Sequence, residues 1–503
     1  MRCRRCRCRR YVLLTPLCIV AGLCFFLFLL PLLRTPDESK YQEAPALVLT
    51  SLSVMDTSQK YRVRQFVSVG DRWQQLPTSA GNWTTCLALH ASLSHVHHVE
   101  RQARSWSGPL SVALFAAGDD VHLLLAYIMF LRRCRQHVRS RVSFHLLWPT
   151  EHPPNDTVVA AGDQLEEADC GENDEQVLQR LLWRQAHPVG EQLSYPQNLA
   201  RNTARLACPT KLTLCPDVDM LPGPRMDLAA GLADLFRREP PCKKCAYILP
   251  VFELDARLAG PPKDKLELQQ LVEDRLARPF HWEIFKDNQK SLDPTRWLQH
   301  ANASSTQLSV AYSVKYGWAF EPVYVAASGE LPLFDESFVG YGFTRNTQAY
   351  EMFAFGWRFF VLDHAFLIHW GLQSIDKRPK WRWKENSINS DRFRKWVNRV
   401  ALKYDVDEMK LTWRYADYDS GMTTCPRQKC KSARPKPTKS TPSPKKQEKP
   451  AKATPKPKNQ EKPTKSTPSP KKQEKPTKGT PSPKKQEKPA KATPTPKKQG
   501  KKA

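Results

Sequence analysis

Residues 431–503 contain no Phe, Trp or Tyr and few acidic side chains, with 24 Lys and Arg against 4 Glu. The same segment holds 16 of the 42 prolines of the chain. A segment without large apolar groups cannot offset the entropy lost on ordering, so we expect residues 431–503 to be disordered. From Lys436 a 13-residue unit occurs in five successive copies, but it lacks the apolar positions that stacked repeats need. These repeats therefore predict an extended, Lys/Pro-rich spacer.

Acidic residues are also missing from the N-terminus, and charge of either sign is missing from the segment that follows. Residues 1–10 contain six Arg, and the 23 residues 11–33 contain no charged side chain. At a rise of 1.5 Å per residue, such a helix spans roughly 34 Å, enough to cross a hydrocarbon core of about 30 Å. The arginines predict a cytosolic tip at 1–10, a transmembrane signal-anchor at 11–33 and a luminal remainder. A cleaved signal peptide is the alternative, but the run is long for one and no small-residue cleavage site follows.

The rest of the chain has no marked excess of charge. Residues 11–430 hold 48 basic and 46 acidic side chains, so the net charge of +28 comes mainly from the two ends. Net charge therefore does not indicate a nucleic-acid-binding domain. Ser-Pro-Lys-Lys occurs three times in the tail, as in DNA-binding tails, but a luminal tail meets no nucleic acid. Binding to polyanionic glycans or acidic partners is the alternative to a plain spacer.

Further features fit a secretory lumen. The chain carries three Asn-x-Ser/Thr triplets, candidate glycosylation sites that begin at Asn82, Asn155 and Asn302. Nine cysteines follow the anchor, and an odd number leaves at least one thiol unpaired or joined to another chain. Two close pairs lie 180 residues apart without a nearby His, which favours disulfides or free thiols over zinc: Cys242/Cys245 and Cys425/Cys430.

Composition and periodicity divide the luminal part into a stem at 34–80 and a domain at 81–430. Short apolar, β-rich runs predict strands at 110–117, 142–148, 211–215 and 246–252. Helical patterns lie at 121–133 and from Ser194-Tyr195-Pro196 onward through QNLARNTARLA. Strands that alternate with helices predict an α/β domain with a mainly parallel central sheet and ligand groups at the carboxyl ends of its strands. No GxGxxG follows the first of these strands, so the dinucleotide-binding fingerprint is absent.

Asp217 and Asp219 directly follow the run 211–215. Two carboxylates spaced i, i+2 at the end of a strand can turn toward one hard cation that keeps open positions for water or phosphate. A sugar-nucleotide donor needs such a cation, because its diphosphate leaves with growing negative charge. The chemistry indicated is metal-assisted transfer from a nucleotide sugar.

Several segments from 87 to 371 make the resemblance specific. They are LALHASLSHV (87–96), WSGPLSVALFAA (106–117), SYPQNLARNTAR (194–205), PDVDMLP (216–222), ILPVFEL (248–254), EPVYVA (321–326), FDESFVGYGFTRNTQAYE (334–351) and FLIHWG (366–371). In this order they resemble glycosyltransferase family 49 and its glucuronyltransferases. The resemblance implies a GT-A-type nucleotide-sugar-binding domain, Mn²⁺, and Golgi residence as a type II membrane protein. It also implies transfer from UDP-glucuronic acid to a xylose-terminated glycan in a β-1,4 linkage, within the O-mannosyl glycan of alpha-dystroglycan.

The resemblance carries over to particular residues. Asp217 and Asp219 match the metal motif of the family, and His369 matches its probable third metal ligand. The alternative for His369 is a core histidine that binds nothing. The family commonly has Lys after this His, where this chain has Trp370, and Pro216 replaces an aliphatic residue.

The helix before the metal motif faces the donor in the family. The implied donor-binding residues are Asn198, Arg201 and Asn202, and a guanidinium suits a phosphate or carboxylate. A solvated basic face is the alternative for Arg201 and Arg205.

Inversion at the sugar requires a base that takes the proton of the acceptor hydroxyl. Asp335 and Glu336 are the candidates for the catalytic base, with Asp335 favoured. The alternative is that one of them only caps a turn or orients the acceptor. Glu321 is a candidate for binding the acceptor.

Three alternatives remain open. The same fold would serve UDP-xylose or UDP-N-acetylglucosamine, because the residues that select the sugar are not identifiable in the sequence. A non-catalytic luminal protein that assists another transferase is a second reading, disfavoured by the set Asp217, Asp219 and His369. A nucleic-acid-binding protein is the third, and it rests on the tail alone. Association with a partner glycosyltransferase, or as a homodimer, is also open.

Overall fold

The computed structural model describes residues 52–75, 83–154, 169–183, 189–224, 227–300 and 307–414. All of them belong to one unit of the chain, which ends at Arg434. Within these described ranges, no helix combines the length and apolar character needed to cross a bilayer. Several predicted features lie outside the described residues: the anchor at 11–33, the tail, and the sequons at Asn82, Asn155 and Asn302.

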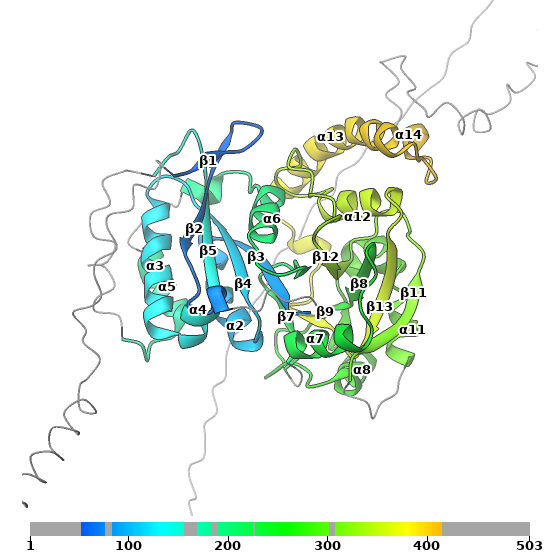
Figure 1. The fold of residues 1–503 in the computed structure, drawn as a ribbon, viewed down its shortest axis with the longest axis horizontal. Helices are drawn as coiled ribbons and strands as arrows, with labels where there is room; N and C mark the ends of the chain where they lie inside the picture. Colours follow the sequence, from blue (N-terminus) through cyan, green and yellow to red (C-terminus); the bar gives the residue numbers. More distant parts are fainter. Residues whose placement is uncertain are drawn as a thin grey trace, which may run out of the picture. The chain divides into compact units, whose positions relative to one another are not determined.

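A ten-stranded sheet runs through the described part of the chain, in the order β1-β2-β5-β4-β3-β6-β12-β8-β13-β11 (Figure 1). Its strands are β1 (Val54–Met55), β2 (Tyr61–Ser68), β3 (Thr85–Ser92), β4 (Leu110–Phe115), β5 (Val142–Pro149), β6 (Leu212–Leu214), β8 (Cys245–Leu249), β11 (Ser309–Val314), β12 (Val323–Ala327) and β13 (Arg358–Asp363). Strands β5, β4, β3 and β6 are parallel neighbours, as are β8 and β13. The other neighbours are antiparallel. The sheet is therefore mixed. The expectation of a mainly parallel sheet fails after β6 in the strand order, because β12 lies between β6 and β8 and runs antiparallel to both.

The sheet begins earlier than residue 81, where we expected the domain to start. Strand β2 pairs with β5 from Tyr61 opposite Pro149 to Arg64 opposite Leu146. Its side chains are half-buried or exposed and include two arginines. A strand near the sheet edge buries little apolar surface, and this explains why residues 61–68 look like a polar stem in the sequence.

A smaller sheet of four strands, ordered β10-β9-β14-β7, positions the functional residues. It consists of β7 (Met220–Pro222), β9 (Val251–Leu254), β10 (Ala277–Pro279) and β14 (Leu367–Trp370). The sequence predicts one strand over 246–252, but the structure divides it at Pro250 into β8 and β9, which belong to different sheets. Proline has no N–H for a central ladder, so the chain changes sheets at that residue.

Helices cover the large sheet. On the side of β2–β5 they are α2 (His98–Ser105), α3 (Asp120–Cys134), α4 (Gln136–Arg141) and α5 (Asp174–Trp183) (Figure 1). Farther along the chain are α6 (Gln197–Leu206), α7 (Leu228–Arg238), α8 (Lys265–Glu273), α9 (Trp282–Phe285), α10 (Asp287–Lys290), α11 (Pro294–Gln299), α12 (Arg345–Ala354), α13 (Trp381–Tyr404) and α14 (Leu411–Arg414). One core cluster, with Trp106 and Trp148, packs around β3–β5. A second, with Trp297 and Trp396, packs around β8, β13, α12 and α13.

Three disulfides link parts of the described chain: Cys86–Cys208, Cys134–Cys170 and Cys242–Cys245. The last one confirms that this close pair is not a zinc site. Cys215 is the free thiol among the described residues, and Cys425 and Cys430 lie outside them.

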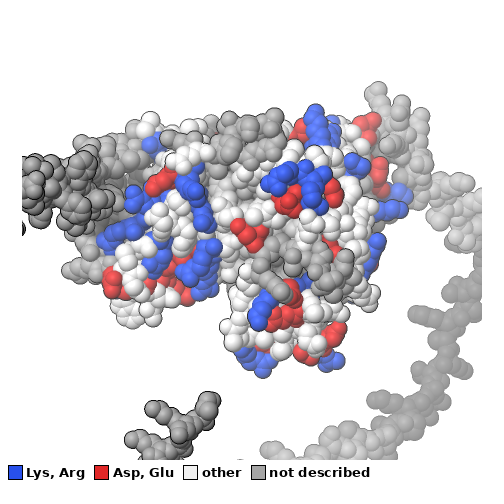
Figure 2. Space-filling view, turned by 60° about the horizontal axis from the view of Figure 1, so that its bottom comes forward, with Lys and Arg blue, Asp and Glu red and all other residues white. Residues whose placement is uncertain are grey.

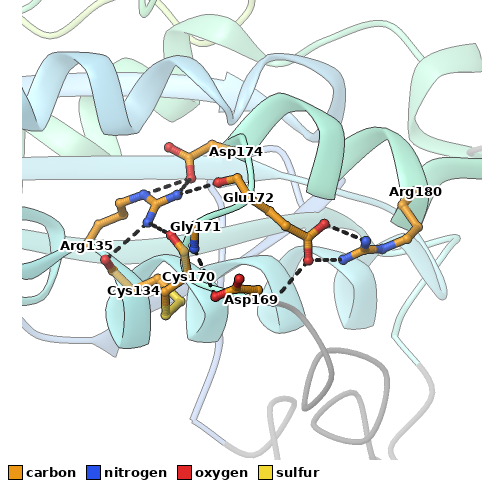
Figure 3. The surroundings of a disulfide bond; sticks show 8 residues. All are labelled: Cys134, Arg135, Asp169, Cys170, Gly171, Glu172, Asp174 and Arg180. Atoms are coloured by element: carbon orange, nitrogen blue, oxygen red, sulfur yellow. Dashed lines mark hydrogen bonds and ion pairs between the residues drawn. A yellow bond between two sulfur atoms is a disulfide. The ribbon is translucent and has the colours of Figure 1, made fainter.

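The bond from Cys134 to Cys170 ties the end of α3 to the start of α5 (Figure 3). Arg135 reinforces this link, because its guanidinium donates to Asp174 Oδ1 at 2.9 Å and to the Cys170 carbonyl at 2.7 Å.

The surface shows no extended field of one sign on the face drawn in Figure 2, where basic and acidic side chains are interspersed. This mixture agrees with the near balance of charge between residues 11 and 430.

Candidate active site

Asp217 and Asp219 lie on the short turn from β6 to β7, at the carboxyl end of β6. Because β3 runs parallel to β6, its carboxyl end meets the same edge of the large sheet. Strand β12 runs antiparallel to β6 and therefore begins at this edge. Gln102, fully buried on α2, donates to the Val218 carbonyl at 2.9 Å and to the Met220 carbonyl at 2.8 Å. This amide fixes the backbone between and after the two carboxylates.

Asp217 is held by two guanidiniums. Its Oδ1 accepts from Arg201 Nη2 at 2.8 Å and from Arg345 Nη2 at 2.6 Å, and Arg345 Nη1 donates to the Cys215 carbonyl at 2.8 Å. Burial alone would raise the pKa of Asp217, but the charges of Arg345 and Arg201 outweigh it and hold the pKa well below its usual value. Asp217 is therefore ionised throughout the physiological range, with its charge already balanced by protein groups.

His90, at the end of β3, also faces Asp217. Its Nε2 lies 3.4 Å from Asp217 Oδ1, and its Nδ1 lies 2.9 Å from the Tyr195 hydroxyl. Burial lowers the pKa of His90 to about 4, despite the nearby carboxylate. The imidazole is thus neutral near pH 7.

Asp219 faces a different partner. His369 is on β14, directly opposite Met220 of β7, and its Nε2 lies 3.4 Å from Asp219 Oδ2. Burial opposes ionisation of both groups, but their mutual attraction lowers the pKa of Asp219 and raises that of His369. The turn after β6 and strand β14 thus bring the side chains of Asp219 and His369 together. The sequence indicates both residues as candidate metal ligands.

The chemistry of this pair fits Mn²⁺, since one carboxylate oxygen and one imidazole nitrogen converge from separate elements. The described residues contain no cluster of three or more His, Cys, Asp or Glu side chains placed so that they could hold a metal ion together. Asp217 lies two residues away, but the two arginines engage its Oδ1. Two protein ligands leave the remaining positions to diphosphate oxygens and water, as is common for hard cations bound together with phosphates.

The predicted donor-binding residues of α6 are buried instead of lining an open pocket. Asn198 Nδ2 donates to the Asp335 carbonyl, and Asn202 Nδ2 donates to the Phe334 carbonyl and to Glu336 Oε1, each at 2.8 Å. Both asparagines are at most 1% exposed. Their amides hold the loop at 334–336 in place. Arg201 is also buried, and Arg205 donates to the Leu331 carbonyl at 3.3 Å, so α6 has no solvated basic face.

The two predicted candidates for the base differ in their surroundings. Asp335 accepts from the Ser337 amide at 3.0 Å and pairs with Arg399 of α13. Burial raises the pKa of Glu336, and the hydrogen bond from Asn202 partly offsets this. The charges that act on Glu336 come from Asp56 and Asp335, which places it toward the β1–β2 hairpin.

Glu321 lies closer to the charges of the site. It precedes β12, and its pKa is raised by burial, with an opposing hydrogen bond from Asn288 and opposing charges on Arg345 and Arg201. Asn288 Nδ2 donates to Glu321 Oε2 at 3.2 Å and lies 3.1 Å from His281 Nδ1. Glu321 is therefore a half-buried carboxyl group with an elevated pKa, and the charges of the arginines that hold Asp217 act on it.

Sequence reasoning missed Arg345 and His90. Arg345 begins α12, and the loop before it contains Gly340 and Gly342 at φ of +78° and +97°. A side chain at either glycine would clash with Glu385 or Asn386 of α13, so only glycine fits this close approach. The sequence GYGFTR was a usable signal, because two glycines before a helix start mark a tight turn that can aim an arginine.

A cavity of about 500 Å³ lies away from these residues. It lies at the other end of β7 and β14, between the first turns of α7 and α8, and is lined by Pro222, Asp227, Lys265 and Phe366 among others. The functional residues therefore occupy the opposite end of the small sheet.

Comparisons with known proteins agree with this geometry. Residues 84–405 match a family model described as "Glycosyl-transferase for dystroglycan". Beta-1,4-glucuronyltransferase 1 of Danio rerio is 31% identical over 362 residues, which cover 71% of this chain and 83% of that protein. The Homo sapiens protein of the same name is 32% identical over 387 residues, covering 75% and 88%. Xylosyl- and glucuronyltransferase LARGE2s of Gallus gallus is 25% identical over 289 residues, covering 56% of this chain and 31% of that protein.

Proposed function

Because this chain belongs to the family of glycosyl-transferases for dystroglycan, as its sequence segments predict, we propose that it is a metal-dependent, inverting glucuronyltransferase. Its donor is UDP-glucuronic acid, and its acceptor is a xylose-terminated glycan of the dystroglycan type, extended in a β-1,4 linkage. The convergence of Asp219 and His369 beside the arginine-held Asp217 is the observation that carries this proposal.

The metal site proposed is the pair Asp219 and His369. When bound, Mn²⁺ supplies positive charge against the diphosphate oxygens, which stabilises the growing charge of departing UDP. Asp217 orients the turn through Arg201 and Arg345 and keeps those two guanidiniums at the edge of the sheet. This role differs from direct coordination and from the donor contact expected of Arg201.

Glu321 is the proposed base in place of Asp335. In a single displacement, the acceptor oxygen forms its bond to the anomeric carbon while the bond to UDP breaks, and the hydroxyl proton moves to Glu321. A raised pKa matches a carboxylate to this task, and the hydrogen bond from Asn288 orients it. Asp335 is less suited, because Arg399 and the Ser337 amide already engage its carboxylate.

The proposed location is the Golgi membrane, with a single-pass type II anchor at 11–33 and a luminal catalytic domain. The disulfides among the described cysteines support an oxidising compartment. The sequons at Asn82, Asn155 and Asn302 would then be open to glycosylation.

A donor panel tests the function. The full chain is incubated with a β-xyloside acceptor, Mn²⁺ or EDTA, and UDP-glucuronate, UDP-xylose or UDP-N-acetylglucosamine, and both UDP release and product linkage are measured. We expect a β-1,4-linked glucuronate that forms only with metal. Transfer from another donor alone would reassign the sugar, and absence of transfer from every donor would favour a non-catalytic partner protein.

A further inference from the structure

Arg378 and Arg382, which follow β14 in the chain, form no ion pair with an acidic side chain of the described residues. Nε and Nη2 of Arg378 and Nε of Arg382 are buried and have no hydrogen-bond partner among the described residues. Both guanidiniums lie over the ring of Tyr341, at 5.1 and 5.2 Å from its centroid. Glu385, whose charge also acts on Arg382, accepts a hydrogen bond from the Tyr341 amide at 2.8 Å. Buried donors without partners are rare in folded proteins, so this pair requires an explanation.

The fold anchors these arginines beside the candidate active site. Glu253 is opposite His369 in the ladder of β9 and β14. Its carboxylate accepts from the His281 amide at 2.8 Å and from the Gln373 amide at 3.1 Å, which ties the segment leading to Arg378 against His281.

The electrostatics of His281 agree with this placement. Burial lowers its pKa to about 3, and the charges of Arg378, His369 and Arg382 act in the same direction. The charges of the two arginines and of His369 therefore act on the same imidazole.

We propose that Arg378 and Arg382 bind an anionic group of the nucleotide-sugar donor, either its diphosphate or its uronate carboxylate. This inference rests on the proposed function, since it names how the same site recognises its donor. A guanidinium binds phosphate or carboxylate through two parallel N–H groups, and the face of Tyr341 fixes the plane of each fork. Two adjacent cations repel one another, and a bound anion relieves this repulsion.

The test compares Arg378→Gln, Arg382→Gln and the double variant in the full chain. The matched control is Arg394→Gln, on the same helix as Arg382, where Arg394 pairs with exposed Asp391. The measurements are the Kd of UDP with Mn²⁺ and the KM for UDP-glucuronate and UDP-xylose. Each variant is also checked for an unchanged Tm, and Arg378→Lys replaces any variant that fails to fold.

We expect the double variant to lose roughly tenfold to a hundredfold in affinity, the value of a charged bidentate contact, while the control stays unchanged. Weaker binding of UDP itself would assign the arginines to the diphosphate. Normal UDP binding with a raised KM for UDP-glucuronate alone would assign them to the carboxylate. Unchanged UDP binding and unchanged KM for both donors would overturn the inference. Wild-type protein that neither binds UDP nor transfers sugar would instead refute the proposed function.

Discussion

Arg345 offers a sharp test of how the site is assembled, because its guanidinium joins a carboxylate to the backbone beside it. Replacement by Met removes a hydrogen bond to Asp217 and one to the Cys215 carbonyl. A hydrogen bond to a charged group contributes about 1.5–3 kcal/mol, and a neutral one about 0.5–1.5 kcal/mol. The side chain of Asp217 is 32% exposed, and Arg201 remains bound to it, so water and the second arginine compensate part of the loss. We expect Arg345→Met to lower the free energy of unfolding by about 2 kcal/mol.

The pH dependence identifies the source of this loss. In the folded protein the pKa of Asp217 lies below its ordinary value, chiefly because Arg345 and Arg201 overcome the effect of burial. A depressed carboxyl pKa stabilises the fold fully above the unfolded pKa, about 3.9, and this stabilisation is lost as the pH falls through the folded pKa. Because the unfolded state is the same in both proteins, the difference between wild type and Arg345→Met should be constant from pH 5 to 7. It should shrink as the pH falls through the folded pKa of Asp217 in the variant.

Urea unfolding at a series of pH values from 7 down to the acid unfolding transition measures both effects. Arg345→Lys is the matched control, because it keeps the charge but loses the planar fork that bridges Asp217 and Cys215, and it should recover part of the lost stability. A loss that stays the same over the whole acid range would show that Arg345 does not act through the pKa of Asp217. No loss at pH 7 would refute the charge-balance argument for Asp217.

Three further outcomes follow from the geometry. Glu321→Gln should reduce kcat roughly 10²–10⁴-fold with little change in Tm. In the wild type, kcat/KM should fall in acid with an apparent pKa above the ordinary value of Glu, since burial raises the pKa of Glu321. Normal turnover of the Glu321→Gln variant would exclude Glu321 as the base. Asp219→Asn and His369→Gln should each raise the Mn²⁺ concentration needed for half-maximal rate at least tenfold, measured by metal titration, and an unchanged requirement would remove that residue from the metal site. Gln102→Leu should lower the free energy of unfolding by about 2–3 kcal/mol in urea, because two buried carbonyls lose their donor; a stable variant would show that the turn needs no such support.

The sequence predicted those parts of the fold that local pattern determines. The helix at 121–133 and the strands at 110–117 and 142–148 correspond to α3, β4 and β5, because long apolar periodicity survives in a buried half of the sheet. Strand β2 and the antiparallel insertion of β12 were missed. Their pairing with β5 and β6, respectively, depends on partners at least 76 residues away in sequence, and neither run carries a strong period of its own.

In the candidate site, too, the sequence predicts some features and not others. A motif and a resemblance in the sequence mark Asp217, Asp219 and His369, and the structure brings Asp219 and His369 together. The hydrogen bonds of Asn198 and Asn202 to the loop at 334–336 could not be read from the sequence, since an amide that faces a donor and one that holds a loop look identical there. The elevated pKa of Glu321 likewise arises from burial against Asn288, which lies 33 residues away.

Charge balance links the two carboxylates of the metal motif to the choice of donor. Arg201 and Arg345 compensate the charge of Asp217, whereas the partner of Asp219 is the imidazole of His369. If the proposed site holds Mn²⁺, the double positive charge of the cation would match the two negative charges of a sugar diphosphate. If Arg378 and Arg382 bind the donor as proposed, a uronate carboxylate would bring them a further negative charge that a neutral sugar lacks. Among donors of equal shape, the electrostatics of the proposed site would therefore favour an acidic sugar over a neutral one.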